Sequence, residues 1–416
     1  MSKHEVTAII LAGGIGTHFL PFVTDKTLFP FMGVSLLSRT LHMFEKSSIA
    51  SAIVVTNERN DQWLSQNKGT FPNLSITSLK QPKPIGMGDA LLTVKHLLPR
   101  SGVLVTNAGD MVDETLVPGL LAMCKDKRAV VTGMEVESYQ PLGYFKMRGD
   151  QATGIVEKPG SDAMPSNLAN LVFHYFSDPI QFANLIEKYK QAATGNEDDI
   201  YEQALSELMR NEDVDVYSYK GPWQKLKFGH HVLDMMTFFL NQLNPSISEE
   251  AHIAKSATIK GNVVIARGAR VSENAVIAGP AYIGENVIVG NNALVRESMI
   301  EEGSRIGFAT EVARSYVGKN CDLHHAYVGD SVLEKDVRLA YGVHTANFRR
   351  DRKPIKLKLL KTSIDTGRTK LGALLGAGTN VGVNVSLMPG ITTGQGCVIY
   401  PGKIVNAALA DHQVVK

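Results

Sequence analysis

The sequence predicts an α/β half with a doubly wound, mostly parallel sheet, followed by a parallel β-helix of six-residue repeats. Over residues 1–240, short apolar runs alternate with helical patterns, and this alternation is typical of parallel sheets covered by helices. After Ser248, aliphatic residues recur every six positions instead, which indicates a solenoid whose coils bury their aliphatics against one another. We therefore expect one domain over residues 1–240 and another over residues 248–416.

The elements of the first domain follow from their local patterns. Strands are predicted where short β-branched or aliphatic runs occur, at residues 6–11, 52–56, 102–106 and 129–132. Helices are predicted where apolar residues follow a helical period, at residues 35–44, 88–98, 178–190, 200–210 and 232–243. The pair Asn244–Pro245 is expected to end the last of these helices.

The repeat of the second domain holds its phase from Ile253 to Val295, is interrupted near Ile300, and slips by one position at Val317. It returns between Leu375 and Val405. A set of β-hairpins would show a period of two instead of six. A basic insertion over residues 341–368 separates the two blocks of repeats, and such a break in a regular scaffold is where function tends to lie.

The composition of the chain limits the classes of partner that it is expected to bind. The chain has 416 residues, and its 43 basic and 41 acidic side chains leave a net charge of only +2. We therefore expect small-molecule substrates and neither a nucleic acid nor a membrane as partner. The three cysteines, Cys124, Cys321 and Cys397, have no disulfide or metal spacing and are expected to be buried thiols. The first six residues lack the apolar region of a signal peptide, so the cytoplasm is the expected compartment.

A glycine-rich loop, Leu11-Ala12-Gly13-Gly14-Ile15-Gly16-Thr17, follows the first predicted strand. Such a loop lets backbone N–H groups approach phosphates closely, although a glycine-rich turn also occurs without any ligand. With Lys26 shortly after, this segment resembles the signature of the sugar-1-phosphate nucleotidyltransferases. Further segments resemble that family in the same order along the chain: Gln81 with 86–90, 107–110, Gly143, 157–159, 167–170 and Trp223.

The resemblance implies the transfer of a nucleotidyl group from a nucleoside triphosphate to a sugar phosphate, with pyrophosphate leaving. It places Lys26 in catalysis at the phosphates and Asp110 as a ligand of Mg²⁺, because phosphate charge must be neutralised. It also implies a set of residues that bind the substrates: Leu11, Gly13, Gly14, Gln81, Gly86, Gly143, Glu157, Lys158 and Asn170. Taken singly, Asp110 could equally be a turn aspartate and Lys158 a solvated charge.

Three positions depart from the family pattern. His18 stands where the family has arginine, and a mostly neutral imidazole lacks the fixed charge of guanidinium. Asp25 stands where the family has proline before its lysine. Lys225 stands at the position of an acidic or amide metal ligand, and an ammonium group cannot coordinate Mg²⁺. We therefore expect nucleotidyl transfer to be weak, altered or lost.

The repeats carry a second group of polar residues, in the segments 324–331 and 345–349 and in the basic insertion. This run resembles the acetyltransferase half of the bifunctional N-acetylglucosamine-1-phosphate uridyltransferases, particularly the archaeal type. The resemblance covers nearly the whole chain and implies a left-handed β-helix that forms trimers or dimers of trimers. It implies acetylation of glucosamine-1-phosphate or galactosamine-1-phosphate by acetyl-CoA, and thus synthesis of a UDP-N-acetylhexosamine such as UDP-N-acetylglucosamine.

By residue, the resemblance makes His324 the catalytic histidine and places Tyr327 and Asn347 at the substrate. A histidine suits the removal of a proton from an attacking amine, and an amide such as Asn347 suits binding the oxyanion or orienting the amine. The resemblance also implies that Lys353 and Lys356 hold the sugar phosphate. Ala373 and Gly390, small residues of the late repeats, are expected beside acetyl-CoA.

Other interpretations of the same residues remain open. His324 could be an ordinary residue at a corner of the solenoid. The adjacent His325, expected on the opposite face of a strand, is the second candidate for the base. The basic insertion could be a solvated loop or could contact a neighbouring chain. The chain as a whole could be a nucleotidyltransferase whose repeats only form oligomers, or a non-catalytic regulatory subunit that binds sugar nucleotides.

Overall fold

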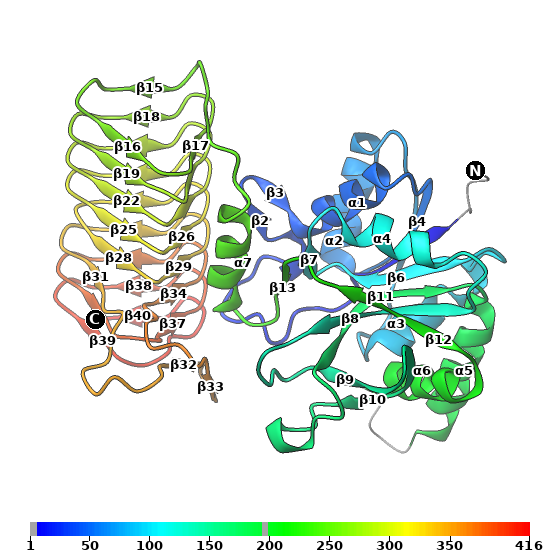
Figure 1. Cartoon of the computed structure of the whole chain (residues 1–416). Coiled ribbons are helices and arrows are strands. Elements are labelled where there is room, and N and C mark those ends of the chain that lie inside the picture. Colours follow the sequence, from blue (N-terminus) through cyan, green and yellow to red (C-terminus); the bar gives the residue numbers. More distant parts are fainter. Residues whose placement is uncertain (1–5, 194–198) are drawn as a thin grey trace. The chain divides into compact units, whose positions relative to one another are not determined.

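The computed structural model describes residues 6–193 and 199–416. The first five residues, on which the signal-peptide expectation largely rests, lie outside this range. The chain forms two compact units, shown in Figure 1. The first comprises the residues up to Ile15 together with Leu36–Trp223, and the second comprises Gly16–Ser35 together with Gln224–Lys416. These units differ from the predicted domains, because Gly16–Ser35 and the last predicted helix group with the repeats.

The first unit is built on a nine-stranded sheet with the order β5-β4-β1-β6-β11-β8-β12-β10-β9. Its strands are β1 (Thr7–Leu11), β4 (Ser51–Thr56), β5 (Ser75–Lys80), β6 (Val103–Asn107), β8 (Ala129–Glu135), β9 (Gly143–Arg148), β10 (Gln151–Glu157), β11 (Leu168–Phe176) and β12 (Val214–Tyr219). The four predicted strands are present, as β1, β4, β6 and β8.

The sheet is mixed, so the prediction of a mostly parallel sheet was only partly right. Strands β5, β4, β1 and β6 are parallel, as are β8 and β12. Strand β11 runs antiparallel to both β6 and β8, and β9 pairs with β10 as an antiparallel hairpin. The sequence of β11 was interpreted as sugar-binding residues, which hid the strand.

Helices cover both faces of the sheet (Figure 1). They are α1 (Leu36–Lys46), α2 (Glu58–Asn67), α3 (Met87–Thr93), α4 (Leu116–Met123), α5 (Pro179–Ala192) and α6 (Ile200–Asn211). Helices α3, α5 and α6 share one apolar core with the sheet, in which Phe182, Ile186 and Leu205 are fully buried. The predicted helix 88–98 ends at Thr93, and a 3₁₀ turn, Lys95–Leu97, continues it.

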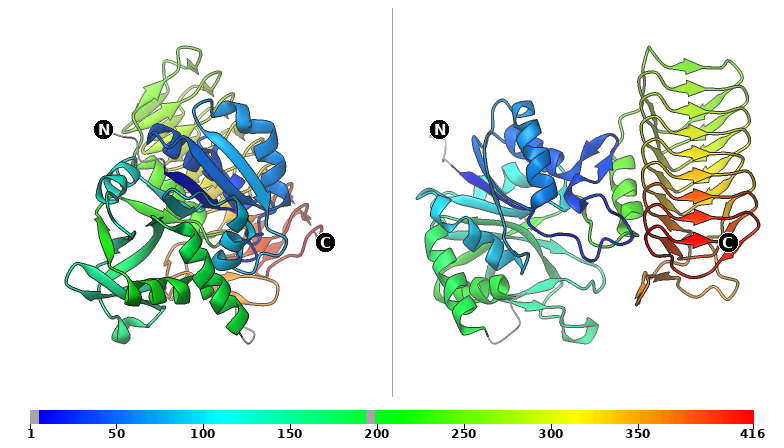
Figure 2. Two further views of the ribbon diagram at one scale, coloured as in Figure 1. Left: turned by 90° about the vertical axis from the view of Figure 1, so that its right-hand side faces the viewer. Right: turned by 180° about the vertical axis from the view of Figure 1, so that it is seen from behind.

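The second unit stacks its repeats into three parallel sheets. In each sheet a strand pairs with the third strand after it in the chain, as β17, β20 and β23 do, except across the β32–β33 hairpin and between β38 and β40. The chain therefore winds through the three sheets in turn. Figure 2 shows the stacked coils from behind in its right panel. Strand order and parallel pairing thus agree with the predicted β-helix; its left-handed winding stays a prediction.

The strands of each sheet are two or three residues long. The first sheet holds β14 (Ser246–Ile247), β17 (Val263–Ile265), β20 (Ala281–Ile283), β23 (Met299–Ile300), β26 (Tyr316–Val317), β29 (Val332–Leu333), β34 (Leu374–Leu375) and β37 (Thr392–Thr393). The second holds β15 (His252–Ile253), β18 (Arg270–Val271), β21 (Ile288–Val289), β24 (Arg305–Ile306), β27 (Asp322–Leu323), β30 (Arg338–Leu339), β35 (Asn380–Val381), β38 (Val398–Ile399) and β40 (Val414–Val415). The third holds β16 (Thr258–Lys260), β19 (Val276–Ala278), β22 (Leu294–Arg296), β25 (Glu311–Ala313), β28 (Tyr327–Gly329), β31 (His344–Thr345), β36 (Ser386–Leu387) and β39 (Ile404–Val405).

The interruptions seen in the sequence are shortened coils. Ile265 pairs with Ile283, 18 positions further on, whereas Ile283 pairs with Ile300 after 17 positions, and Val317 pairs with Leu333 after 16. Buried serines satisfy the backbone at these tighter corners: Ser298 Oγ accepts from the N–H of Ser315, whose own Oγ accepts from the N–H of Ser331. Each hydroxyl thus replaces a backbone partner that the shorter coil lacks.

The insertion begins later than predicted. Strand β31 still lies in the stack, pairing with both β28 and β36, so the excursion starts only after Thr345. It contains a hairpin of β32 (Lys356–Lys358) and β33 (Ser363–Asp365), which projects from the coils in Figure 1. An isolated bridge between Phe348 and Lys370 closes its base. The six-residue phase is lost from the sequence in this coil because its inward repeat position, the register partner of Leu387, is Thr345 and not an aliphatic residue.

Gly16–Ser35 and helix α7 (His231–Leu240) pack against the first sheet of the solenoid. This segment holds a 3₁₀ turn, Lys26–Leu28, and the short hairpin of β2 (Pro30–Phe31) and β3 (Val34–Ser35). The rings of Phe29 and Phe31 lie 5.2 and 5.7 Å from the ring of Tyr316, and Tyr316 Oη donates to the carbonyl of Pro30 over 2.9 Å. The segment therefore shares an aromatic core with the coils.

All three cysteines are buried and unbonded, as predicted. Burial raises the pKa of the Cys124 and Cys321 thiols to about 12, so both stay protonated at neutral pH. Among the described residues, none of the helices has the length and hydrophobicity that a membrane span needs.

Candidate functional site

The glycine-rich loop of the first unit is held from behind by the start of helix α2. Asn57 caps this helix, and its Nδ2 donates to the carbonyl of Gly14 over 3.1 Å. Asn60 Nδ2 donates to the carbonyl of Ala12 over 2.8 Å. Because these carbonyls are turned toward α2, the loop is fixed in one conformation. Sequence reasoning missed both asparagines, although Asn57 directly follows a predicted strand.

Gln81 lies directly against the loop. A Cβ atom added at Gly13 would approach the Cβ atom of Gln81 to 2.9 Å, so only glycine fits there. Gln81 Nε2 donates to Asp89 Oδ2 over 2.8 Å, and Lys190 Nζ contacts Asp89 Oδ1 at 2.5 Å. The predicted pair Gly13 and Gln81 is thus brought together, and Asp89 and Lys190 orient the amide of Gln81. Gly86 begins helix α3 at a φ of 113°, which favours glycine.

The predicted sugar-binding residues fall into two groups. Gly143 and Glu157 are register partners in the β9–β10 hairpin, and a side chain at Gly143 would overlap the Glu157 carboxylate. Lys158 follows with a left-handed φ of 45°. Asn170 instead turns toward the interior, where its Oδ1 lies 2.8 Å from Nε2 of the buried His174. Part of its amide is therefore used inside the fold.

Asp110 begins β7 (Asp110–Val112) and is buried. Leu11 ends β1 and is buried as well. No group of three or more His, Cys, Asp or Glu side chains within residues 6–193 and 199–416 is arranged to hold a metal ion. Among the described residues, Asp110 therefore belongs to no such cluster. Mg²⁺ often takes only one or two protein carboxylates together with substrate phosphates, so Asp110 fits the part of one such ligand.

The three residues that depart from the family pattern, His18, Asp25 and Lys225, all lie in the second unit. Asp25 caps the turn that begins at Lys26: its Oδ1 accepts from the N–H of Thr27 over 2.8 Å. The ring of His18 packs edge-on against Phe228 at 5.7 Å. Lys225 ends β13 (Trp223–Lys225) and is half-buried. Lys26 is also half-buried, and a Cβ atom added at Gly16 would lie 3.8 Å from its Cβ.

The solenoid brings Tyr327 and Asn347 together at the third sheet. Asn347 Nδ2 donates to Tyr327 Oη over 3.2 Å and to Asp330 Oδ2 over 2.5 Å. Asp330 is buried, and Arg314 grips its carboxylate with two bonds of 2.7 and 2.8 Å. Arg314 and Asp330 both occupy left-handed corner positions, with φ of 49° and 48°. Neither was predicted; the missed signal was a basic and an acidic residue at the same corner of successive coils.

His324 and His325 lie at the corner between β27 and β28. Their expected arrangement on two faces of a strand was wrong, because His325 takes a φ of 50° and turns the chain. The ring of His325 stacks on Tyr341 at 4.5 Å and on Phe308 at 6.1 Å. His324 stays exposed, with Tyr341 edge-on at 6.1 Å. His325 therefore shapes the corner, and His324 remains the accessible candidate for the base.

A further histidine adjoins Tyr327. His344 begins β31 and is the register partner of Tyr327 in the third sheet. Register partners in a parallel pair point to the same face, so the exposed His344 lies on the face that carries Tyr327. Sequence reasoning missed it, although it holds in its coil the repeat position that Tyr327 holds one coil earlier.

The insertion is clamped to the late coils. Gly390, at a φ of 71°, lies so close to the backbone of Lys356 that a side chain there would overlap it. Lys358 donates from its N–H to the carbonyl of Gly390 and from Nζ to the carbonyl of Asn406, both over 2.7 Å. Gly390 thus has a packing role within the chain. Ala373 is fully buried in the core of the coils.

The predicted phosphate-binding lysines are exposed on the insertion. Lys353 follows Asp351, which pairs with Arg349 at 2.6 Å; the Arg349 hydrogen bond lowers the pKa of Asp351 to about 2. In the described part of the chain, the side chains of Lys353 and Lys356 form no hydrogen bond or ion pair with Tyr327, Asn347 or His324. Within the chain, no direct bond therefore links the two lysines to these three residues.

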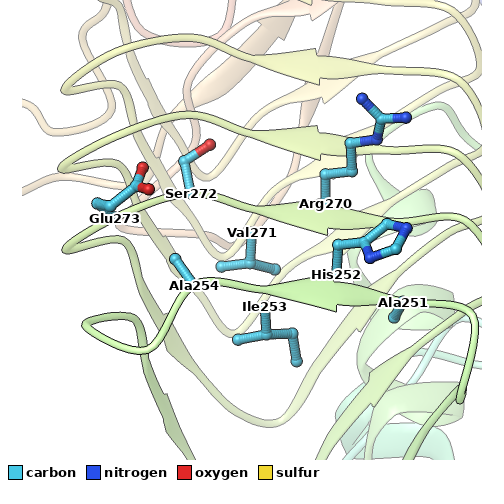
Figure 3. A pocket seen from close by; sticks show the side chains of 8 residues that line it. All are labelled: Ala251, His252, Ile253, Ala254, Arg270, Val271, Ser272 and Glu273. Atoms are coloured by element: carbon cyan, nitrogen blue, oxygen red, sulfur yellow. The ribbon is translucent and has the colours of Figure 1, made fainter.

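Two hollows lie elsewhere. One of about 510 Å³ follows the first two coils, where Figure 3 shows His252 and Arg270 side by side and Glu273 at the far corner. It contains none of the predicted site residues. The other, of about 340 Å³, lies in the first unit and includes Glu157 beside Tyr189, Glu202 and Arg210.

Comparison with known proteins covers the whole chain. The nucleotidyl transferase family matches residues 7–225, and the GMPPB C-terminal domain matches residues 259–349. A bifunctional sugar-1-phosphate nucleotidylyltransferase/acetyltransferase of Sulfurisphaera tokodaii is 27% identical over 407 residues, covering 96% of this chain and 97% of the relative. The bifunctional protein GlmU of Methanocaldococcus jannaschii is 29% identical over 415 residues, covering 98% and 97%.

Solved structures support the fold of the first unit. A UDP-glucose pyrophosphorylase in its apo form superposes with a TM-score of 0.51 at 16% identity, covering 57% of this chain and 98% of that one. The resemblance that the motifs predicted, to bifunctional nucleotidylyltransferase/acetyltransferase enzymes of archaeal type, is confirmed by the full-length relatives. The match over residues 7–225, more than half of the sequence, shows that the chain belongs to the nucleotidyl transferase family.

Proposed function

We propose that the solenoid transfers an acetyl group from acetyl-CoA to the amine of an amino sugar 1-phosphate, glucosamine-1-phosphate or galactosamine-1-phosphate. The observation that carries this proposal is the polar site on the third sheet, where Tyr327 and Asn347 are hydrogen-bonded beside the exposed His344 and one corner from His324. A scaffold that only forms oligomers needs no such buried, ion-paired network. The full-length likeness to the Sulfurisphaera tokodaii acetyltransferase adds support.

The reaction requires a general base and polar groups that bind the substrate amine. The amine nitrogen attacks the thioester carbonyl, a C–N bond forms, the C–S bond breaks, and coenzyme A leaves as the thiol. His324 takes the proton that the nitrogen loses, because its exposed imidazole carries a ring nitrogen that can accept it. Lys353 and Lys356 hold the sugar phosphate, and they act on the site of a neighbouring chain, as the resemblance to acetyltransferases with a site between subunits implies. The coils therefore assemble as trimers or dimers of trimers.

We propose that the family segments within residues 7–225 carry the nucleotidyl-transfer activity. Gly13 and Gly14 approach the triphosphate, Gln81 binds the base, and Gly143, Glu157 and their neighbours bind the sugar. Lys26 contacts phosphate, and Asp110 is one ligand of Mg²⁺, which neutralises phosphate charge when bound. Lys225, at the position where the family has a second metal ligand, and His18, in place of arginine, weaken nucleotidyl transfer, so acetyl transfer is the stronger of the two activities. The product pathway is UDP-N-acetylhexosamine synthesis, and the expected compartment is the cytoplasm.

A thiol-release assay tests the acetyl transfer. Acetyl-CoA is mixed with glucosamine-1-phosphate, galactosamine-1-phosphate or each sugar without its phosphate, and free thiol is measured. The wild-type chain should release thiol only with an amino sugar phosphate. His324→Ala should lose activity by about 10²- to 10⁴-fold, the usual contribution of a general base.

Matched histidine variants sharpen this test. His344→Ala, on the face that carries Tyr327, should lower activity less than His324→Ala, and the exposed His252→Ala on the first coils should leave it unchanged. Full activity in His324→Ala would move the base to another residue. No thiol release from the wild type with any amino sugar phosphate would refute the acetyltransferase proposal and favour coils that only form oligomers.

Pyrophosphate release tests the proposed nucleotidyl transfer. The wild type, with Mg²⁺, a sugar-1-phosphate and each nucleoside triphosphate in turn, should release pyrophosphate slowly. Lys225→Asp restores a carboxylate at the second ligand position and should raise the rate at least tenfold, provided that Lys225 is what limits metal binding. Brisk turnover of the wild type, or no gain in Lys225→Asp, would contradict the weakened-site proposal.

A further inference from the structure

The amide of Asn347 is held in one orientation. Its terminal atom next to Asp330 lies 2.5 Å from Oδ2, and Asp330 is ion-paired with Arg314. An ionised carboxylate only accepts hydrogen bonds, so the atom that faces it must be the nitrogen of the amide. That nitrogen also donates to Tyr327 Oη over 3.2 Å. Both N–H groups of the amide are therefore already used inside the protein.

The oxygen of the same amide is left for another partner. No donor within the described residues forms a hydrogen bond with Asn347 Oδ1, and the residue is half-buried, not sealed. The hydroxyl of Tyr327 accepts from Asn347, so its own proton is free to be donated outward. The pair thus presents one acceptor, Asn347 Oδ1, and one donor, Tyr327 Oη–H.

Close packing preserves this arrangement. A Cβ atom added at Gly329 would approach Tyr327 Oη to 2.6 Å and Asn347 Nδ2 to 2.7 Å, so the two side chains close over a glycine. The backbone of Asn347 is fixed too, since its carbonyl accepts from the N–H of Leu371 over 3.0 Å. Asp330 is only 5% exposed, and Arg314 holds both of its oxygens. Solvent therefore has little access to the bonds that orient the amide.

We propose that Asn347 accepts a hydrogen bond from the substrate amine through Oδ1 and does not donate to the oxyanion, and that Asp330 and Arg314 are the positioning residues that impose this role. The proposal rests on the proposed acetyl transfer. An acceptor directed at the amine orients its lone pair for attack on the thioester and helps to hold the nitrogen while His324 removes the proton. Of the two roles open to Asn347 from its sequence context, only orientation of the amine remains.

Exchanging the residues at positions 330 and 347 distinguishes an acceptor role of Asn347 from a donor role. Asp330→Asn weakens the hold on Asn347 and should lower kcat/KM for the amino sugar phosphate about ten- to a hundredfold, the loss that one charge-assisted hydrogen bond corresponds to. Asn347→Asp places two carboxylates together and should lower it at least as far. In the double variant the two groups trade places. The amide at position 330 then donates to the carboxylate at position 347, which still presents an oxygen to the amine.

The double variant should therefore be at least tenfold more active than Asn347→Asp alone. Were Asn347 an oxyanion donor, its carboxylate replacement could not donate, and the double variant would stay as inactive as the single one. That result would overturn the proposal. Asp322→Asn, which changes an exposed aspartate on the same solenoid, should leave kcat/KM within twofold and serves as the control.

Thermal unfolding checks the pairing without any activity. Asp330→Asn and Asn347→Asp should each lower Tm, and the double variant should lose less than the sum of the two losses, because the exchanged pair restores a hydrogen bond. Additive losses would refute the pairing itself. If the pairing holds but the wild type acetylates no amino sugar phosphate, the function proposed above is wrong and the role of Asn347 at the amine falls with it.

Discussion

His174 shows how one buried side chain makes the stability of the first unit depend on pH. It lies on β11, fully buried, between Tyr201 Oη at 2.9 Å and Asn170 Oδ1 at 2.8 Å. Burial lowers the pKa of His174 from 6.5 to about 3. The folded chain therefore keeps the ring neutral at pH values where the unfolded chain protonates it.

This difference makes the folded state less stable in acid. Below pH 6.5 the unfolded state binds a proton that the folded state refuses, so the free energy of unfolding falls as pH drops toward 3, by up to about 1.4 kcal/mol per pH unit for this residue. Urea unfolding between about pH 7.5 and 4.5 measures this slope. His174→Gln should reduce it, and the exposed His96→Gln should not. Equal slopes in all three proteins would show that His174 does not contribute.

The candidate site could be predicted in part from residue identity. Tyr327 and Asn347 were expected at one site and are hydrogen-bonded. Their partners Arg314 and Asp330 were not expected, because each resembles an exposed corner residue when only the sequence is considered. Which face a residue occupies depends on coil length, and that length changes from 18 to 16 residues within the solenoid.

At the scale of elements, the segment Gly16–Ser35 depends on carboxylates about 300 positions away. Glu334 is buried, and its Oε1 accepts from the N–H and the hydroxyl of Thr24, over 2.9 and 2.6 Å. Its Oε2 accepts from the N–H of Ala377 over 2.9 Å. Glu301 accepts from the N–H of Gly33 over 2.9 Å. These backbone amides have the charge-assisted partners that a buried loop requires.

Glu334→Ala should therefore release this segment. Leaving these donors unsatisfied costs about 1–3 kcal/mol for each buried group, and hydrogen–deuterium exchange at residues 22–35 should become faster. The control is Glu302→Ala, which removes only an exposed pair with Lys319 and should change exchange there little. Unchanged exchange in Glu334→Ala would show that the aromatic contacts with Tyr316 and the bond to Glu301 are sufficient to hold the segment.

The helices and strands of the first unit were predicted more accurately than their pairing. Runs such as 52–56 and 102–106 identify strands by composition, but strand direction is set by connections that composition does not encode. The hairpin β9–β10 and the antiparallel β11 were therefore missed. The end of α3 at Thr93 also escaped prediction, because the apolar pattern continues through the following 3₁₀ turn.

At the scale of the whole molecule, two periodicities in the sequence correspond to two kinds of packing. Strands alternating with helices gave the nine-stranded sheet, and the six-residue phase gave the three sheets of coils. The predicted division of the chain at residues 240–248 was drawn where the periodicity changes. The compact units divide elsewhere, because contacts of Gly16–Ser35 with the coils join residues that no local pattern connects.

This grouping constrains any attempt to recombine the chain with a relative. A chimera spliced between residues 240 and 248 would separate Gly16–Ser35 from Tyr316, Glu301 and Glu334 of its own coils. A functional chimera must therefore exchange Gly16–Ser35 and Gln224–Lys416 together. Lineages descended from this architecture are thus expected to inherit the two stretches jointly.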